Sequence, residues 1–187
     1  MNDYQKQAAI WYWDGYDNSP EYDYWCAYAA QFGKNVLIPM CAHGQIGAYM
    51  AGKGFNVVAF DITPEMIAEG KKRYGTVNGL ELVTANLLEL DLCDKNIDFT
   101  FIAGNGDFHL LQTTHDIERA FISLYKHMRK SGCLVLELTL PSNESWSSPK
   151  KHSTQEYRIM QTRKFGKKTK VYTTPMKNDI ISIKLSI

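Results

Sequence analysis

The residues best placed for chemistry lie between Val36 and Asp61, where a small-residue turn and a carboxylate each follow an apolar run. Residues 36–38 form the first run, which leads into the turn 40–44 and then a helical stretch. The second run, 55–60, ends on Asp61. In nucleotide-binding strand–turn–helix–strand units, such a turn lets the backbone approach the ligand, and the acid accepts hydrogen bonds from ribose hydroxyls. The pattern therefore predicts a ligand that contains a ribose.

The elements that must position these groups alternate between strands and helices. Apolar runs predict strands at residues 36–38, 55–60, 80–84, 99–103 and 134–138. Helical spacing of apolar residues, with Thr63 and Pro64 as a start signal and Gly54 as a stop signal, predicts helices at 45–53, from 64 to near 75, and at 116–128. This alternation predicts an α/β fold with a doubly wound, mostly parallel sheet of the Rossmann-like kind.

Two further segments flank this core. Residues 4–32 are rich in aromatic side chains and read as helical, with a turn signal at residues 18–20. After a polar stretch, the runs 157–165 and 169–174 surround a Gly-Lys-Lys turn, and residues 180–187 alternate in the manner of a half-buried strand. We therefore expect one domain over residues 1–187. It would consist of an N-terminal helical lid at 1–33, a core at 34–141 and a C-terminal antiparallel β-meander at 142–187.

Composition narrows the function classes. The 187 residues are 44% apolar and 22% charged, which fits one globular domain. With 21 basic and 20 acidic residues, the charge balance argues against nucleic acid or a membrane surface as the main partner. The four cysteines, Cys26, Cys41, Cys93 and Cys133, lack metal-ligand spacing, so we expect reduced thiols and no metal site. The N-terminus has no signal-peptide pattern and no run reaches membrane-span length, which predicts a cytoplasmic protein.

The order of these motifs resembles the class I S-adenosylmethionine-dependent methyltransferases over residues 22–141. Residues 36–44 stand where that family has an apolar pair, an acid and a glycine-rich turn, and residues 58–67 match its second strand, ribose-binding acid and helix start. Residues 84–90 resemble the turn after the third strand, with Asn86 in place of an acid that contacts adenine. Residues 98–111 resemble the fourth strand and the loop that follows it.

The resemblance implies S-adenosylmethionine as cofactor, S-adenosylhomocysteine as product and a small-molecule methyl acceptor. It implies these cofactor-binding residues: Tyr24, Met40, Cys41, Ala42, Gly44, Asp61, Ile62, Asn86, Leu87, Gly104 and Asn105. His109 and Asp107, in the loop after the fourth strand, are the candidate catalytic bases. Methyl transfer needs a base only when the acceptor nitrogen, oxygen or carbon must lose a proton.

The departures from the family pattern keep an alternative open. Ile38 replaces the usual first-strand acid, and Met40 and Ala42 replace two glycines, so either residue would be strained if the turn requires a positive φ. The alternative is a catalytically silent or partner-dependent protein that binds S-adenosylmethionine or S-adenosylhomocysteine. A nicotinamide-dependent enzyme is disfavoured because the chain lacks the G-x-G-x-x-G turn. Neither the acceptor nor the oligomeric state follows from the sequence.

Overall fold

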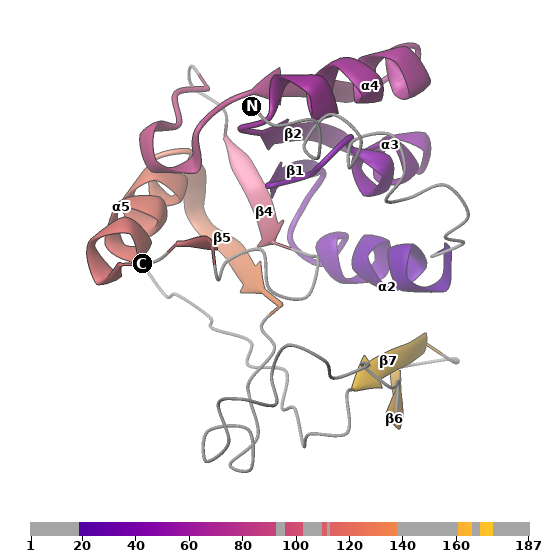
Figure 1. The fold of residues 1–187 in the computed structure, drawn as a ribbon. Coiled ribbons are helices and arrows are strands. Elements are labelled where there is room, and N and C mark those ends of the chain that lie inside the picture. The colour runs from indigo at the N-terminus through magenta and orange to yellow at the C-terminus, as the bar shows by residue number, and fades with distance from the viewer. Residues whose placement is uncertain are drawn as a thin grey trace, which may run out of the picture.

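The computed structural model describes residues 19–92, 96–102, 110–111, 113–137, 161–165 and 169–173 (Figure 1). The helices are α2 (Ser19–Ala29), α3 (Gln45–Gly52), α4 (Pro64–Tyr74), α5 (Thr114–Tyr125) and the short 3₁₀ helix η1 (Leu87–Glu89). The strands are β1 (Asn35–Pro39), β2 (Asn56–Asp61), β3 (Leu80–Thr84), β4 (Ile97–Ile102), β5 (Met128–Leu136), β6 (Gln161–Phe165) and β7 (Thr169–Thr173).

Strands β1 to β5 form one parallel sheet in the order β3-β2-β1-β4-β5. The chain starts at the centre, moves outward through β2 to β3, and then returns to β4 on the other side of β1. The strand order therefore reverses between β1 and β4, and in open parallel sheets ligands bind beyond the carboxyl ends of the strands at such a point. The predicted doubly wound α/β sheet is confirmed.

Helices cover both faces of the sheet (Figure 1). On one face α2, α3 and α4 enclose a core that includes Val36, Ile38 and Phe99. On the other face α5 and η1 enclose a second core that includes Leu37. Successive strand residues point to opposite faces, so the continuous apolar run at 36–38 reflects a strand buried on both sides.

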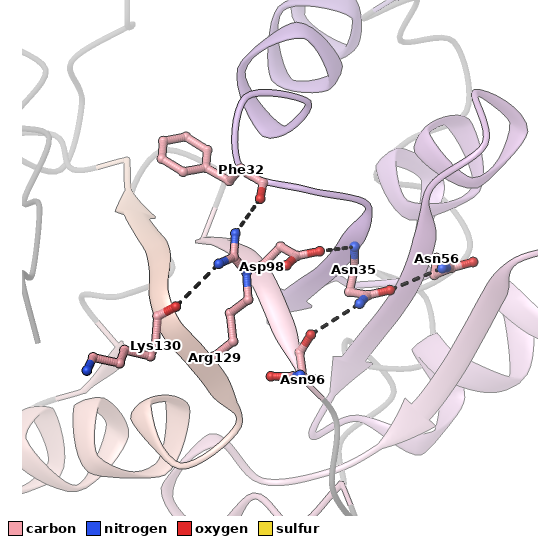
Figure 2. Close-up of polar contacts among 7 residues, drawn as sticks. All are labelled: Phe32, Asn35, Asn56, Asn96, Asp98, Arg129 and Lys130. Carbon is pink, nitrogen blue, oxygen red and sulfur yellow. Dashed lines mark hydrogen bonds and ion pairs between the residues drawn. The ribbon is translucent and has the colours of Figure 1, made fainter.

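Polar contacts hold together the amino edge of the sheet (Figure 2). The Asp98 carboxylate accepts the backbone N–H of Asn35 at 2.9 Å and pairs with the Arg129 guanidinium, which also donates to the Phe32 carbonyl at 2.6 Å. The Asn56 side chain donates to the Asn35 side chain at 3.1 Å. These contacts join the end of α2, β1, β2, β4 and β5 at the edge opposite the expected ligand site.

One predicted boundary is wrong. The helix expected at 116–128 ends at Tyr125, and Met128 already belongs to β5, which begins six residues before the expected 134. The first half of β5 is polar, and Ser131 has a φ of 68°, with a shift in the β4–β5 register between Ile97 and Phe99. An irregular strand start that is only partly buried carries no apolar run that would reveal it in the sequence.

The segments outside the core are described only in part. Strands β6 and β7 pair antiparallel, with Gln161 opposite Thr173 and Phe165 opposite Thr169. The strand expected at 180–187 and the helical segment expected before residue 19 lie outside the described residues, so the complete meander and lid stay predictions. No helix in the described part of the chain is both long and apolar enough to cross a membrane.

Candidate functional site

Asp61 joins two turns at the carboxyl edge of the sheet. One carboxylate oxygen accepts the backbone N–H of Ala42 at 3.0 Å, and the other accepts that of Thr63 at 2.9 Å. Each carboxylate oxygen can accept about two hydrogen bonds, so acceptor capacity remains for a ligand. The half-buried Asp61 therefore offers a fixed, negatively charged acceptor to a pair of hydroxyl groups.

The first turn has an unusual backbone conformation. Met40 and Ala42 have φ angles of 54° and 51°, and Gly44 has a φ of 83°. The turn is held by Cys41, whose backbone N–H donates to the Phe60 carbonyl at 2.9 Å and whose carbonyl accepts the Gly44 N–H at 2.8 Å. A residue with a Cβ pays about 1–2 kcal/mol in this left-handed region, and such strain is often found at ligand-binding sites. The strain expected at Met40 and Ala42 is therefore observed.

Helix α4 packs against this turn. The His43 side chain is 1% exposed, and its ring centroid lies 6.0 Å from that of Tyr74 on α4. Gly70 on α4 meets the turn so closely that an added Cβ would lie 2.2 Å from the His43 carbonyl oxygen. The turn therefore has little freedom to relax its strained angles, and His43 has a packing role.

The Cys41 thiol is not suited to act as a nucleophile. Its Sγ donates to the Ala42 carbonyl at 3.5 Å. Burial raises the pKa of the Cys41 thiol well above its usual range, and the nearby Asp61 carboxylate raises it further. The thiol therefore stays protonated at neutral pH.

The second and third turns add an apolar surface and an amide. Ile62, next to Asp61, is 66% exposed, so its apolar side chain is accessible to a ligand. The Asn86 side-chain oxygen accepts the backbone N–H of Leu88 in η1 at 3.0 Å. The Asn86 NH₂ group is therefore the part of this amide that can donate to a ligand. The Ala85 N–H donates to the Asp61 carbonyl at 3.0 Å, so the two turns are directly connected.

Comparison with known proteins agrees with this geometry. Residues 36–132, more than half of the chain, match the family described as "Methyltransferase domain". The chain belongs to the methyltransferase domain family. A curated relative of this methyltransferase-family chain is YqeM of Bacillus subtilis (strain 168), provisionally named a methyltransferase. It is 22% identical over 103 residues, which cover 55% of this chain and 41% of YqeM. The match thus spans about two fifths of that relative's length.

Solved structures share the fold of this methyltransferase domain. A TehB-like SAM-dependent methyltransferase from Corynebacterium glutamicum has a TM-score of 0.61 at 21% identity, covering 72% of this chain and 73% of that one. The sugar N-methyltransferase KedS8 from Streptoalloteichus has a TM-score of 0.59 at 18% identity, over 70% and 52%. N-methyltransferase NodS from Bradyrhizobium japonicum, in complex with S-adenosylhomocysteine, has a TM-score of 0.58 at 15% identity, over 72% and 70%.

The methyltransferase domain brings together most of the described site residues. Those at the carboxyl ends of β1, β2 and β3 are Met40, Cys41, Ala42, Gly44, Asp61, Ile62 and Asn86. The Leu87 side chain is 5% exposed and packs in the core beneath α5, which leaves only its backbone for a ligand. Tyr24 lies on α2, with its ring centroid 5.1 Å from that of Trp25. Gly104, Asn105, Asp107 and His109 lie outside the described residues.

Sequence reasoning missed two carboxylates at the same edge of the methyltransferase domain. Glu21 lies on the first turn of α2, and Glu137 directly follows β5. Burial raises the pKa of Glu21 to about 6; the charge of Glu137 raises it too, whereas the Trp25 indole lowers it. The available signal was the four-residue spacing of Glu21 and Trp25 on one helix face, together with an acid at the end of an apolar strand.

Proposed function

We propose that this chain binds S-adenosylmethionine and transfers a methyl group to a nucleophilic atom of a small molecule. The observation that carries the proposal is the Asp61 carboxylate, which bridges the strained first turn and the turn before α4 beside an exposed Ile62. Membership of the methyltransferase domain family supports it. The described residues offer no group of three or more His, Cys, Asp or Glu side chains arranged to hold a metal ion.

The side chains fit the parts of this cofactor. Asp61 would accept hydrogen bonds from the two ribose hydroxyls, and Ile62 would cover one face of the adenine ring. The Asn86 NH₂ group would donate to a ring nitrogen, and the backbone of the turn at 40–44 would lie against the methionine part. When bound, S-adenosylmethionine supplies an electrophilic methyl group on a sulfonium sulfur.

The acceptor is proposed to be a small molecule. The sugar N-methyltransferase KedS8, which shares the fold, supports this substrate class for the chain. The acceptor would bind beyond β4, between the cofactor and α2. We further propose Tyr24, Gly104 and Asn105 as cofactor contacts, and His109 or Asp107 as the base when the acceptor must lose a proton.

A second candidate is a protein that binds the cofactor or its product without turnover, alone or until a partner subunit completes the site. Two observations favour it. Met40 and Ala42 hold positive φ angles without being glycines. Ile38 is 1% exposed inside the core, so the end of β1 offers no acid to the amino group of the cofactor. Binding without methyl transfer, in an acceptor screen that detects S-adenosylhomocysteine formation, would select this candidate.

Calorimetric titration with S-adenosylhomocysteine and S-adenosylmethionine tests the proposal, with a nicotinamide dinucleotide as the control ligand. We expect binding of the two sulfur compounds only. Asp61→Ala should weaken S-adenosylhomocysteine binding by about 1 to 3 kcal/mol, through loss of charge-assisted hydrogen bonds. Glu118→Gln, which removes a negative charge from the exposed face of α5, should leave the Kd unchanged.

Two outcomes would contradict the assignment. A wild-type protein that binds neither sulfur compound would refute the proposed cofactor. An unchanged Kd in the Asp61→Ala variant would remove Asp61 from the site, provided that a thermal melt shows the variant to be folded.

A further inference from the structure

Gln45 is the first residue of α3 and directly follows the strained turn at 40–44. Its side-chain carbonyl oxygen, Oε1, is buried and has no hydrogen-bond partner among the described residues. A buried acceptor without a donor destabilises the folded state, so most such groups in proteins are paired. Gln45 therefore presents an acceptor that a ligand with a donor group would satisfy.

The Gln45 side chain lies on the side of α3 that faces α2. Helix α3 connects the parallel strands β1 and β2, so it runs back across the sheet and begins at the carboxyl edge. One turn further along α3, the Tyr49 hydroxyl donates to the Asp23 carboxylate of α2 at 2.7 Å, and α2 and α3 lie side by side (Figure 1). Residues four apart share one side of a helix, so Gln45 faces α2 as Tyr49 does. Because side chains lean toward the N-terminus of their helix, that of Gln45 leans toward the carboxyl edge of the sheet.

The chemistry of the proposed cofactor decides which donor fits this acceptor. At the nucleoside end the donors are the ribose hydroxyls and the adenine amino group, and Asp61 is proposed to bind the ribose. At the methionine end the donor is the α-ammonium group, which is positively charged and accepts no hydrogen bond. The turn at 40–44 is proposed to lie against this end, and Gln45 follows the turn directly. A buried carbonyl oxygen beside the turn therefore suits the ammonium group and would repel the neighbouring carboxylate.

The segment between the end of β1 and α3 offers no other side-chain carbonyl or carboxylate. Ile38 is 1% exposed in the core and has an apolar side chain. The Cys41 thiol donates to the Ala42 carbonyl, and burial raises its pKa so that it stays protonated. After Ile38, Gln45 is the first residue whose side chain carries a carbonyl oxygen.

We propose that Gln45 Oε1 accepts a hydrogen bond from the α-ammonium group of S-adenosylmethionine and of S-adenosylhomocysteine. This inference rests on the proposed function and adds a binding residue for the methionine end of the cofactor. Gln45 supplies from α3 the acceptor that Ile38 lacks. By fixing the methionine end beside the first turn, the contact also orients the sulfur atom that carries the methyl group.

Calorimetry with two ligands tests Gln45 separately from the rest of the site. The ligands are S-adenosylhomocysteine and its desamino analogue, which keeps the carboxylate and lacks only the ammonium group. Gln45→Leu should weaken S-adenosylhomocysteine binding about tenfold, through loss of a hydrogen bond to a charged group, and should change binding of the analogue by less than about twofold. Gln45→Glu should bind S-adenosylhomocysteine at least as tightly as the wild type, because a carboxylate is the stronger acceptor for an ammonium group. Gln31→Leu, the matched control, removes an exposed amide just after α2 and should leave both Kd values unchanged.

The two proposals fail in different ways. A wild type that binds neither ligand refutes the proposed cofactor, and this inference with it. If the wild type binds S-adenosylhomocysteine, the Gln45 contact alone is refuted by an unchanged Kd in Gln45→Leu, by equal losses for the two ligands, or by weaker binding in Gln45→Glu. A thermal melt, together with retained binding of the desamino analogue, shows that the variants are folded.

Discussion

Replacing Glu21 by Gln should stabilise the protein at neutral pH, because the substitution removes a mostly buried carboxylate. The carboxyl of Glu21 is mostly buried and lies near Glu137, so ionisation is less favourable in the folded state than in the unfolded chain. A pKa of about 6, against the ordinary value of 4.5, corresponds to about 2 kcal/mol. This destabilisation is absent below pH 4.5, grows as the pH rises to about 6, and is complete above that value.

Urea unfolding of the wild type and Glu21→Gln at several pH values between about 4.5 and 8 measures this effect. We expect the variant to be more stable by about 2 kcal/mol at pH 7.5, which corresponds to a rise in Tm of roughly 4 to 8 °C for a chain of this size. Near pH 4.5 the two proteins should converge.

Glu118→Gln is the matched control, because it removes a charge from an exposed position on α5. Its difference from the wild type should stay within about 0.5 kcal/mol over the whole pH range. The reasoning would be refuted if the stability difference between Glu21→Gln and wild type were the same at pH 4.5 and 7.5. It would also be refuted if the variant were less stable at neutral pH.

Urea unfolding also tests two further predictions, one on the packing of the first turn, with Gly52→Ala as its control, and one on the buried His127. Gly70→Ala should destabilise the protein by about 1–3 kcal/mol and weaken S-adenosylhomocysteine binding, because the new Cβ would press on the His43 carbonyl. Gly52→Ala has open space around its Cβ and should be neutral or stabilising by up to about 1 kcal/mol; equal effects of the two would contradict the packing argument. His127→Phe should cost about 1–3 kcal/mol, because the Leu92 N–H loses its buried acceptor at 3.1 Å, and an unchanged unfolding midpoint would argue against that bond.

The sequence was sufficient for the elements that combine an apolar run with a clear end signal. Strand β3 has the predicted bounds, and α4 begins at Pro64 after the predicted cap residue Thr63, although the Thr63 side chain makes no cap hydrogen bond. The start of β5 was missed because residues 129–132 are polar or glycine and none of residues 128–132 is fully buried. In this case pairing with β4, a tertiary property, extends the strand beyond its apolar part.

The site residues that lie within one sequence motif could be predicted from the sequence. Asp61 and the first turn lie within a single strand–turn–helix–strand unit, so their proximity follows from local order. Glu21 and Glu137 are separated by most of the chain. Their proximity depends on the direction of α2 across the sheet and on the alternation of side chains along β5, neither of which a motif reports. The backbone support that Asp61 gives to Ala42 was likewise visible only in three dimensions.

The docking of α2 has a consequence for the folding of the chain during synthesis. Its end is held by Arg129 through the Phe32 carbonyl, a contact between residues 97 positions apart, and its centre packs on Phe101. At translation rates of 5 to 20 residues per second, roughly 5 to 20 seconds would pass between the addition of Phe32 and the addition of Arg129. During that interval the apolar side of the nascent helix has no sheet to cover it. Until β5 is complete, this exposed apolar surface makes the nascent chain prone to aggregation.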